Sequence, residues 1–162
     1  MLFRSYYVEK FLARKPRLQH DTPGLVVDPE FFITICCNPR RRNQLCNTRV
    51  ARLIVEAFRF YRKKRFCQIE LLVLMPDHLH AIIKVPDSVN LGSWISALKH
   101  WITRKSTIRF QGNFFDHRLR SSVSASQKWN YVSMNPVRSG FVERSEDWPY
   151  RFTTRDFERM LH

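Results

Sequence analysis

Two histidines separated by a single residue, His78 and His80, have a spacing that could place two imidazoles around one ion. Alternate side chains of a β-strand project from the same face, so the two residues would stand about 6.5–7 Å apart along the chain. Imidazole is the commonest metal ligand among the side chains that titrate near neutral pH. A pair of this kind also occurs in sheets that bind no metal, so the pair by itself leaves both interpretations open.

The residues around the pair favour a site. Met75-Pro76-Asp77 interrupts the chain just before His78, which puts the pair at the start of a strand, where loops and solvent can reach it. Leu79 and Ala81 would face the other way and enter the core. The strand would then have one apolar face and one face with two histidines, and packing alone gives no reason for both.

A tyrosine near the end of the last expected helix is the second candidate. Tyr131 and Asn135 are four residues apart and therefore share one helical face, with Gln127 one turn earlier. Trp129 and Val132 mark a different, buried stripe. A phenol in this place can be a nucleophile that forms a covalent intermediate, or simply an amphipathic residue at the edge of a helix.

The elements that would position these residues follow from hydrophobic periodicity. Strands are predicted over residues 31–36, 67–74, 78–85 and 114–120, and helices over 49–65, 91–102 and 121–134. This βαββαβα order predicts an α+β sandwich with antiparallel pairing and helices against one face. We assign residues 1–29 to an N-terminal basic arm, 30–150 to the main domain and 151–162 to a C-terminal tail.

The chain of 162 residues is strongly basic, since 28 Lys and Arg stand against 14 Asp and Glu, a formal net charge of +14. A small domain with this charge normally binds a polyanion. Between residues 38 and 66, ten basic side chains accompany one acidic side chain, whereas a merely solvated helix face usually mixes both signs. The candidate nucleic-acid contacts in this stretch are Arg40, Arg41, Arg42, Arg49, Arg52, Arg59, Arg62, Lys63 and Lys64.

Other classes of protein are disfavoured. The longest strongly apolar run, residues 69–76, is far shorter than the ~20 residues that a membrane span needs, so we expect no membrane partner. The 4 cysteines include no CxxC pair, which disfavours a zinc site or a disulfide framework. We expect reduced, mostly buried thiols in a cytoplasmic protein.

Two blocks of sequence carry a family resemblance. MPDHLHAIIKVP, residues 75–86, resembles the histidine–hydrophobe–histidine block of the single-tyrosine HUH transposases, and WNYVSMNPVRSGFV, residues 129–142, resembles their tyrosine helix. FFITICCNPRRRNQL and GNFFDHRLRS look like the family's first strand and the strand before the tyrosine helix. The blocks follow the family's order over about residues 30–150. The Asn-Pro ending of the tyrosine block points to the branch associated with repetitive extragenic palindromes (REP) in bacterial chromosomes.

The resemblance implies a ferredoxin-like α+β fold with a central antiparallel sheet of four to five strands. It also implies a bacterial, cytoplasmic transposase that cuts and joins single-stranded DNA with hairpins, such as those palindromes, through a 5′-phosphotyrosine. By position, Tyr131 becomes the nucleophile, while His78, His80 and Asn135 become ligands of Mg²⁺ or Mn²⁺. A monomer is favoured over a dimer.

Two further arginines and one departure from the family pattern complete these expectations. Arg118 and Arg120 precede the tyrosine helix and could clamp the phosphate near the metal. Asp77 stands where the family most often has Asn, so it could add a carboxylate near the metal or cap a turn. The alternatives left open are a non-catalytic hairpin-binding regulator derived from a transposase, and an RNA-binding protein.

Overall fold

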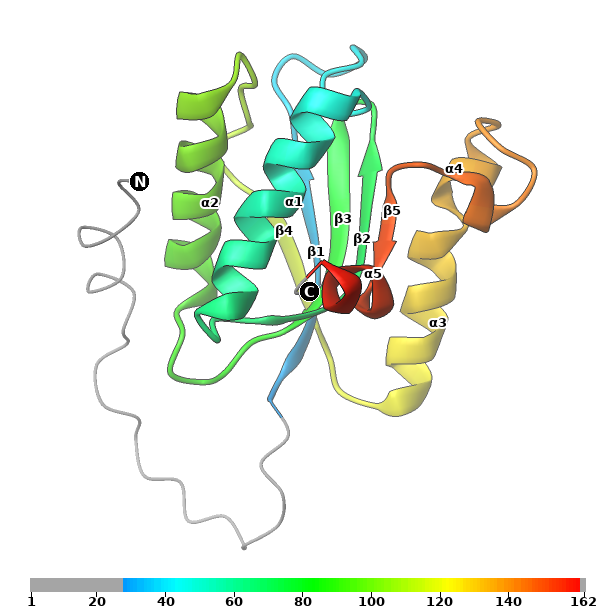
Figure 1. The fold of residues 1–162 in the computed structure, drawn as a ribbon. Helices are drawn as coiled ribbons and strands as arrows, with labels where there is room; N and C mark the ends of the chain where they lie inside the picture. Colours follow the sequence, from blue (N-terminus) through cyan, green and yellow to red (C-terminus); the bar gives the residue numbers. More distant parts are fainter. Residues whose placement is uncertain (1–27, 161–162) are drawn as a thin grey trace, which may run out of the picture.

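The computed structural model describes residues 28–160, so the basic arm assigned to 1–29 lies almost wholly outside the described residues (Figure 1). Its elements, in chain order, are β1 (Glu30–Cys36), α1 (Thr48–Lys63), β2 (Gln68–Met75), β3 (His78–Lys84), α2 (Leu91–Lys105), β4 (Phe115–Leu119), α3 (Ser122–Ser133), α4 (Asn135–Arg138), η2 (Ser145–Asp147), β5 (Arg151–Thr153) and α5 (Thr154–Arg159).

The strands form one five-stranded antiparallel sheet in the order β4-β1-β3-β2-β5. The strand β1 pairs with β3 along its whole length, from Glu30 opposite Lys84 to Cys36 opposite His78. The expected α+β class with a central antiparallel sheet is therefore confirmed. The βαββαβ core from β1 to β4 is the split arrangement of ferredoxin-like domains.

Helices cover both faces of the sheet, whereas the order of the elements predicts helices against one face only. The helices α1 and α2 pack on the face that carries Ile33, Leu79 and Ala81. The helix α3 packs through Val132 on the opposite face, where Ile82 is buried. Figure 1 shows α1 and α2 together on one side and α3 apart from them. Both faces of the central strands are apolar, so each face needs a cover.

Residues 151–160 of the segment expected to be a C-terminal tail belong to the fold, which corrects that assignment. The strand β5 pairs with β2 at the edge of the sheet, and α5 buries Phe157 completely among the residues under α1. The indole nitrogen of Trp148 donates to the carbonyl of Leu74 at 2.9 Å just before β5. A strand of three residues and a helix of six are too short to show a hydrophobic period, so the pattern missed them.

The helix that carries Tyr131 begins and ends where the sequence indicates. Ser121 caps α3 through a capping box with Ser124. The helix ends at Met134, and Asn135-Pro136 opens the short helix α4, with proline in the first turn, where its missing N–H costs nothing. The tyrosine and the asparagine therefore lie on either side of the junction between α3 and α4.

Candidate active site

The two histidines stand at the start of β3, on the sheet face that α3 covers. His80 lies opposite Thr34 of β1 and Val73 of β2, and side chains paired across strands share a face. The rings of His78 and His80 are 4.8 Å apart between centroids and inclined by 76°. The expected common face for the pair is therefore present.

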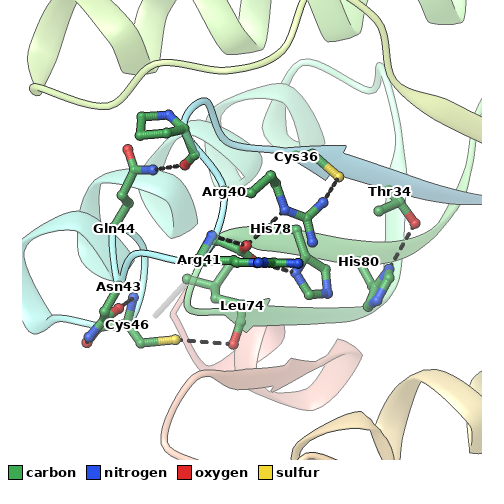
Figure 2. Close-up of polar contacts among 12 residues, drawn as sticks. Thr34, Cys36, Arg40, Arg41, Asn43, Gln44, Cys46, Leu74, His78 and His80 are labelled. Carbon is green, nitrogen blue, oxygen red and sulfur yellow. Dashed lines mark hydrogen bonds and ion pairs between the residues drawn. The ribbon is translucent and has the colours of Figure 1, made fainter.

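One nitrogen of each imidazole is held by a neighbouring side chain (Figure 2). His80 Nδ1 is 2.8 Å from Thr34 Oγ1, and His78 Nδ1 is 2.8 Å from Asp77 Oδ1. Metal-binding histidines usually have such a partner on the second ring nitrogen, because it fixes the ring orientation and the tautomer. The two Nε2 atoms have no hydrogen-bond partner among residues 28–160 and are the nitrogens available to a ligand.

Asp77 joins the histidine to the basic loop that follows β1. Its Oδ2 accepts hydrogen bonds from Arg40 Nε at 2.8 Å and from the Arg41 backbone N–H at 2.7 Å. Burial opposes ionisation, but hydrogen bonds from His78, Arg41 and Arg40 outweigh it and lower the pKa of Asp77 to about 2. The carboxylate is therefore ionised at neutral pH. Arg40 also donates to Cys36 Sγ at 2.7 Å, which anchors the loop to the end of β1.

His80 stays neutral in this environment. Burial lowers its pKa to about 3, with smaller contributions from the positive charges of His78, Lys128, Arg138 and Arg40. A neutral imidazole has the free lone pair that a metal requires. Lys128 of α3, Arg138 of α4 and Arg40 of the loop thus add to the positive potential at His80.

Tyr131 is connected to the histidines by contacts through Lys128 and Phe32. Its ring is half exposed and stacks under the Arg138 guanidinium, at 4.1 Å, with Lys128 Nζ at 5.1 Å. The same Lys128 Nζ lies 4.7 Å from the Phe32 ring centre, and that ring is 5.4 Å from the His80 ring. Lys128 therefore contacts the rings of both Tyr131 and Phe32, and the Phe32 ring packs against His80.

Asn135, one turn after Tyr131, has an incompletely satisfied amide. Its Oδ1 accepts from Arg138 Nη2 at 3.2 Å, and its buried Nδ2 has no hydrogen-bond partner. Arg138 Nη2 also donates to the Tyr131 carbonyl at 2.6 Å, so one guanidinium ties the junction of α3 and α4 together. A rotation of the amide by about 180° would exchange the positions of its nitrogen and oxygen. The oxygen would then be available as a ligand for a cation.

The side chains of His78, His80 and Asn135 have the ligand types that a divalent ion accepts. They are imidazoles and an amide, not a cluster of carboxylates or thiolates. Among residues 28–160 no three His, Cys, Asp or Glu side chains gather as a metal site. Two imidazole nitrogens lie together at the start of β3, and the amide of Asn135 lies at the junction of α3 and α4, where it contacts Arg138. Mixed nitrogen and oxygen donors of this kind suit Mn²⁺ and tolerate Mg²⁺.

The basic residues expected to contact nucleic acid divide between the two faces of the sheet. Arg40, Arg41 and Arg42 lie in the exposed loop beside Asp77, close to the histidines. The other six expected contacts lie on or just after α1, which packs on the opposite face: Arg49, Arg52, Arg59, Arg62, Lys63 and Lys64. Arg49 and Arg52 line a cavity of about 590 Å³ together with Arg104 and Lys105 of α2.

The expectation that Arg118 and Arg120 clamp a phosphate beside the metal is not met. Arg118 pairs with Phe31, whose ring packs under α1 and α2, so the arginine lies on the face away from His80. It is also three residues along β1 from Thr34, about 10 Å. Arg120 lines a hollow with Glu30, at the far end of β1.

Lys128, Arg138 and Thr34 were not anticipated. A helical signal existed for the first two, because Lys128 precedes Tyr131 by three residues and Arg138 follows Asn135 by three. Nothing in the local pattern marks Thr34, since its role depends on the register between β1 and β3.

Within residues 28–160, no helix combines the length and the apolar character that a membrane span requires.

Known proteins resemble this chain in both sequence and fold. A REP-associated tyrosine transposase of Escherichia coli strain K12 is 28% identical over 125 residues, which cover 75% of each protein. A relative from Haemophilus influenzae is 28% identical over 108 residues, which cover 56% of this chain and 61% of the relative. A solved REP-associated tyrosine transposase bound to a REP hairpin has the same fold, with a TM-score of 0.70, 24% identity and coverage of 90% of this chain and 88% of the other.

A family model extends over most of the sheet and of α3. The model described as "Transposase IS200 like" matches residues 30–132, a stretch that includes both histidines and Tyr131. Because the match covers more than half of the chain and agrees with the relatives and the fold, this protein belongs to the IS200-like transposase family.

Proposed function

We propose that this protein is a metal-dependent nuclease and strand transferase that acts on single-stranded DNA containing hairpins, through a phosphotyrosine at Tyr131. The observation that carries the proposal is a convergence on one sheet face. Lys128 contacts the rings of both Tyr131 and Phe32, the Phe32 ring packs on His80, and the Nε2 atoms of both histidines have no hydrogen-bond partner among residues 28–160. The REP-hairpin ligand of the solved relative supports hairpin DNA as the substrate class.

The histidines and Asn135 would hold a divalent cation, Mg²⁺ or Mn²⁺. Thr34 and Asp77 orient the two rings from behind, so little entropy is lost when the ligand nitrogens are engaged. When bound, such an ion supplies positive charge next to a phosphate oxygen and stabilises the charge that develops there.

Tyr131 performs the covalent step in this proposal. Its oxygen bonds to the phosphorus of the scissile phosphodiester while the bond from phosphorus to the 3′-oxygen breaks. The phenol gives up its proton and the leaving 3′-oxygen gains one, so the products are a 5′-phosphotyrosine and a 3′-hydroxyl. One phosphoester replaces another, and attack by a 3′-hydroxyl therefore reverses the step without ATP.

The surrounding cations would bind and orient the DNA backbone. Lys128 and Arg138 lie beside the phenol, and the Arg40–Arg42 loop borders His78 through Asp77. Each phosphate that such a side chain neutralises releases counterions, so we expect binding to weaken steeply as salt rises.

The decisive experiment looks for a covalent adduct. Full-length protein is mixed with labelled single-stranded hairpin DNA and Mn²⁺ and resolved under denaturing conditions. We expect a protein–DNA band that requires metal and is absent in Tyr131→Phe. Tyr150→Phe is the matched control, because Tyr150 packs on the core beneath α1 and α2 and against the Trp148 ring. This variant should form the adduct normally.

An adduct that persists in Tyr131→Phe would show that another residue is the nucleophile. Hairpin binding that is equal with and without metal, together with no nicking under any divalent ion, would instead identify a non-catalytic hairpin-binding protein. Competition between single-stranded RNA and DNA of matched sequence tests the RNA-binding alternative.

A further inference from the structure

The edge strand β4 presents an exposed phenylalanine on the same face as the histidines. Phe115 pairs with Thr34, which in turn pairs with His80, so the three side chains form one row across the sheet. Neighbouring strands are about 4.8 Å apart, which puts Phe115 roughly 10 Å from His80. Yet 56% of the surface of Phe115 is exposed, in contrast to its neighbour Phe114, which packs on the core under α1 and α2.

Phe115 is the open end of a series of aromatic contacts that leads to the histidines. Its ring meets Phe32 edge to face at 5.9 Å, the Phe32 ring is 5.4 Å from His80, and His80 is 4.8 Å from His78. Phe32 is buried, whereas Phe115, which packs against its ring, is exposed. His117, two residues further along β4, is exposed on the same face.

The positive charges near Phe115 and Phe32 favour one kind of ligand for the exposed Phe115 ring. Lys128 Nζ lies over Phe32, and Lys128, Arg138 and Arg40 all act on His80. A second copy of a chain with net charge +14 would bring like charges together here. A nucleic-acid strand instead offers phosphates for the cations and flat bases for the ring.

We propose that Phe115 is a stacking platform for an unpaired nucleobase of single-stranded DNA, next to the phosphate held at the histidines. The inference rests on the proposed function and names a subsite of that site. Bases stack on aromatic side chains of a sheet surface without regard to sequence, because every base has a π-face. Phe115 would then fix where the strand enters, while Lys128 contacts its backbone.

The test measures binding without chemistry. Full-length protein in EDTA is titrated with an unstructured, fluorescent single-stranded oligonucleotide. We expect Phe115→Ala and Phe115→Leu to bind roughly 5- to 150-fold more weakly than the original chain, which is the range that the loss of one stacked base implies. Phe115→Trp should retain most of the affinity, because it keeps a ring.

Phe141→Ala is the matched control. Phe141 is exposed to 49% but stacks on Trp148, so its removal should leave DNA affinity unchanged. Equal affinity of Phe115→Leu and Phe115→Trp would show that apolar area, not stacking, matters and would overturn the inference. Normal DNA affinity of Phe115→Ala would also overturn the inference. It would do so even if sedimentation showed that the substitution converts a dimer of this protein to a monomer.

Failure of this inference can be told from failure of the proposed function. A metal-dependent adduct in the original chain combined with normal DNA affinity of Phe115→Ala rejects only the stacking platform. Weakened DNA binding of Phe115→Ala combined with no adduct under any divalent ion rejects only the nuclease.

Discussion

At the scale of single residues, Asp77 does more than cap a turn. One carboxylate oxygen holds His78 Nδ1, and the other holds the Arg40 side chain and the Arg41 backbone. The loop therefore cannot move without disturbing a candidate metal ligand. Because a partner on the second ring nitrogen fixes the orientation of an imidazole, Asp77 would hold His78 in place as a metal ligand.

Asp77→Ala should weaken Mn²⁺ binding by roughly 10–100-fold, the usual effect of removing a partner of a metal-binding histidine. Titration calorimetry with Mn²⁺ alone measures this without any DNA. Asp77→Asn should lose less, since an amide oxygen can still accept a hydrogen bond from His78. Asp116→Ala, which removes an exposed acid of β4, is the control and should bind Mn²⁺ normally. Unchanged affinity in Asp77→Ala would mean that His78 needs no orienting partner.

At the scale of elements, the last strand and helix help to hold the tyrosine helix in place. Arg151 of β5 donates to Ser133 Oγ at 3.0 Å and lies 5.3 Å from the Trp129 ring centre, so it contacts two residues of α3. The segment from β5 to α5 also closes the edge of the sheet at β2, and Phe157 of α5 enters the core. Folding of the C-terminal segment and placement of Tyr131 are therefore linked.

Phe157→Ala should lower the free energy of unfolding by about 3–5 kcal/mol, because it leaves a cavity where a fully buried ring stood. Urea denaturation followed by circular dichroism measures this change. Val123→Ala, at a residue of α3 that is 63% exposed, serves as the control and should change stability little. A small effect of Phe157→Ala would mean that α5 is not part of the cooperative core.

At the scale of the whole molecule, two of the surfaces where positive charge gathers lie on opposite faces of the sheet. One surface surrounds the histidines and consists of the Arg40–Arg42 loop with Lys128 and Arg138. The other is the cavity between α1 and α2, lined by Arg49, Arg52, Arg104 and Lys105 and only one acid, Glu56. The sheet separates the two surfaces. A short segment of single-stranded DNA bound at the histidines would therefore not cover the second surface, which could contact DNA further from the cleavage point.

The double variant Arg49→Ala/Arg52→Ala should weaken hairpin binding and reduce its salt dependence. The slope of log affinity against log salt is negative, and each lost phosphate contact reduces its magnitude by about 0.7–0.9. Fluorescence anisotropy over a series of salt concentrations measures the slope. Arg144→Ala is the control, because Arg144 is already paired with Asp147 and lies outside both surfaces. A slope identical to that of the original chain would show that this cavity does not contact the hairpin.

Local periodicity was enough to predict the βαββαβ core, the common face of His78 and His80, and the helix that carries Tyr131. Each of these depends on residues close together in the chain, where spacing alone decides which side chains share a face. The free state of all 4 cysteines, which the residues also predict, agrees with the structure.

Only the tertiary structure decided which residues surround the histidines. Thr34 reaches His80 through the register of β1 with β3, and Arg118 turns away from it through the register of β1 with β4. The packing of α3 on its own face brings Lys128 over the Phe32 ring, and the short helix α4 brings Arg138 over the Tyr131 ring. Strand register and helix packing are set by burial summed over the whole sheet, so no local segment encodes these contacts.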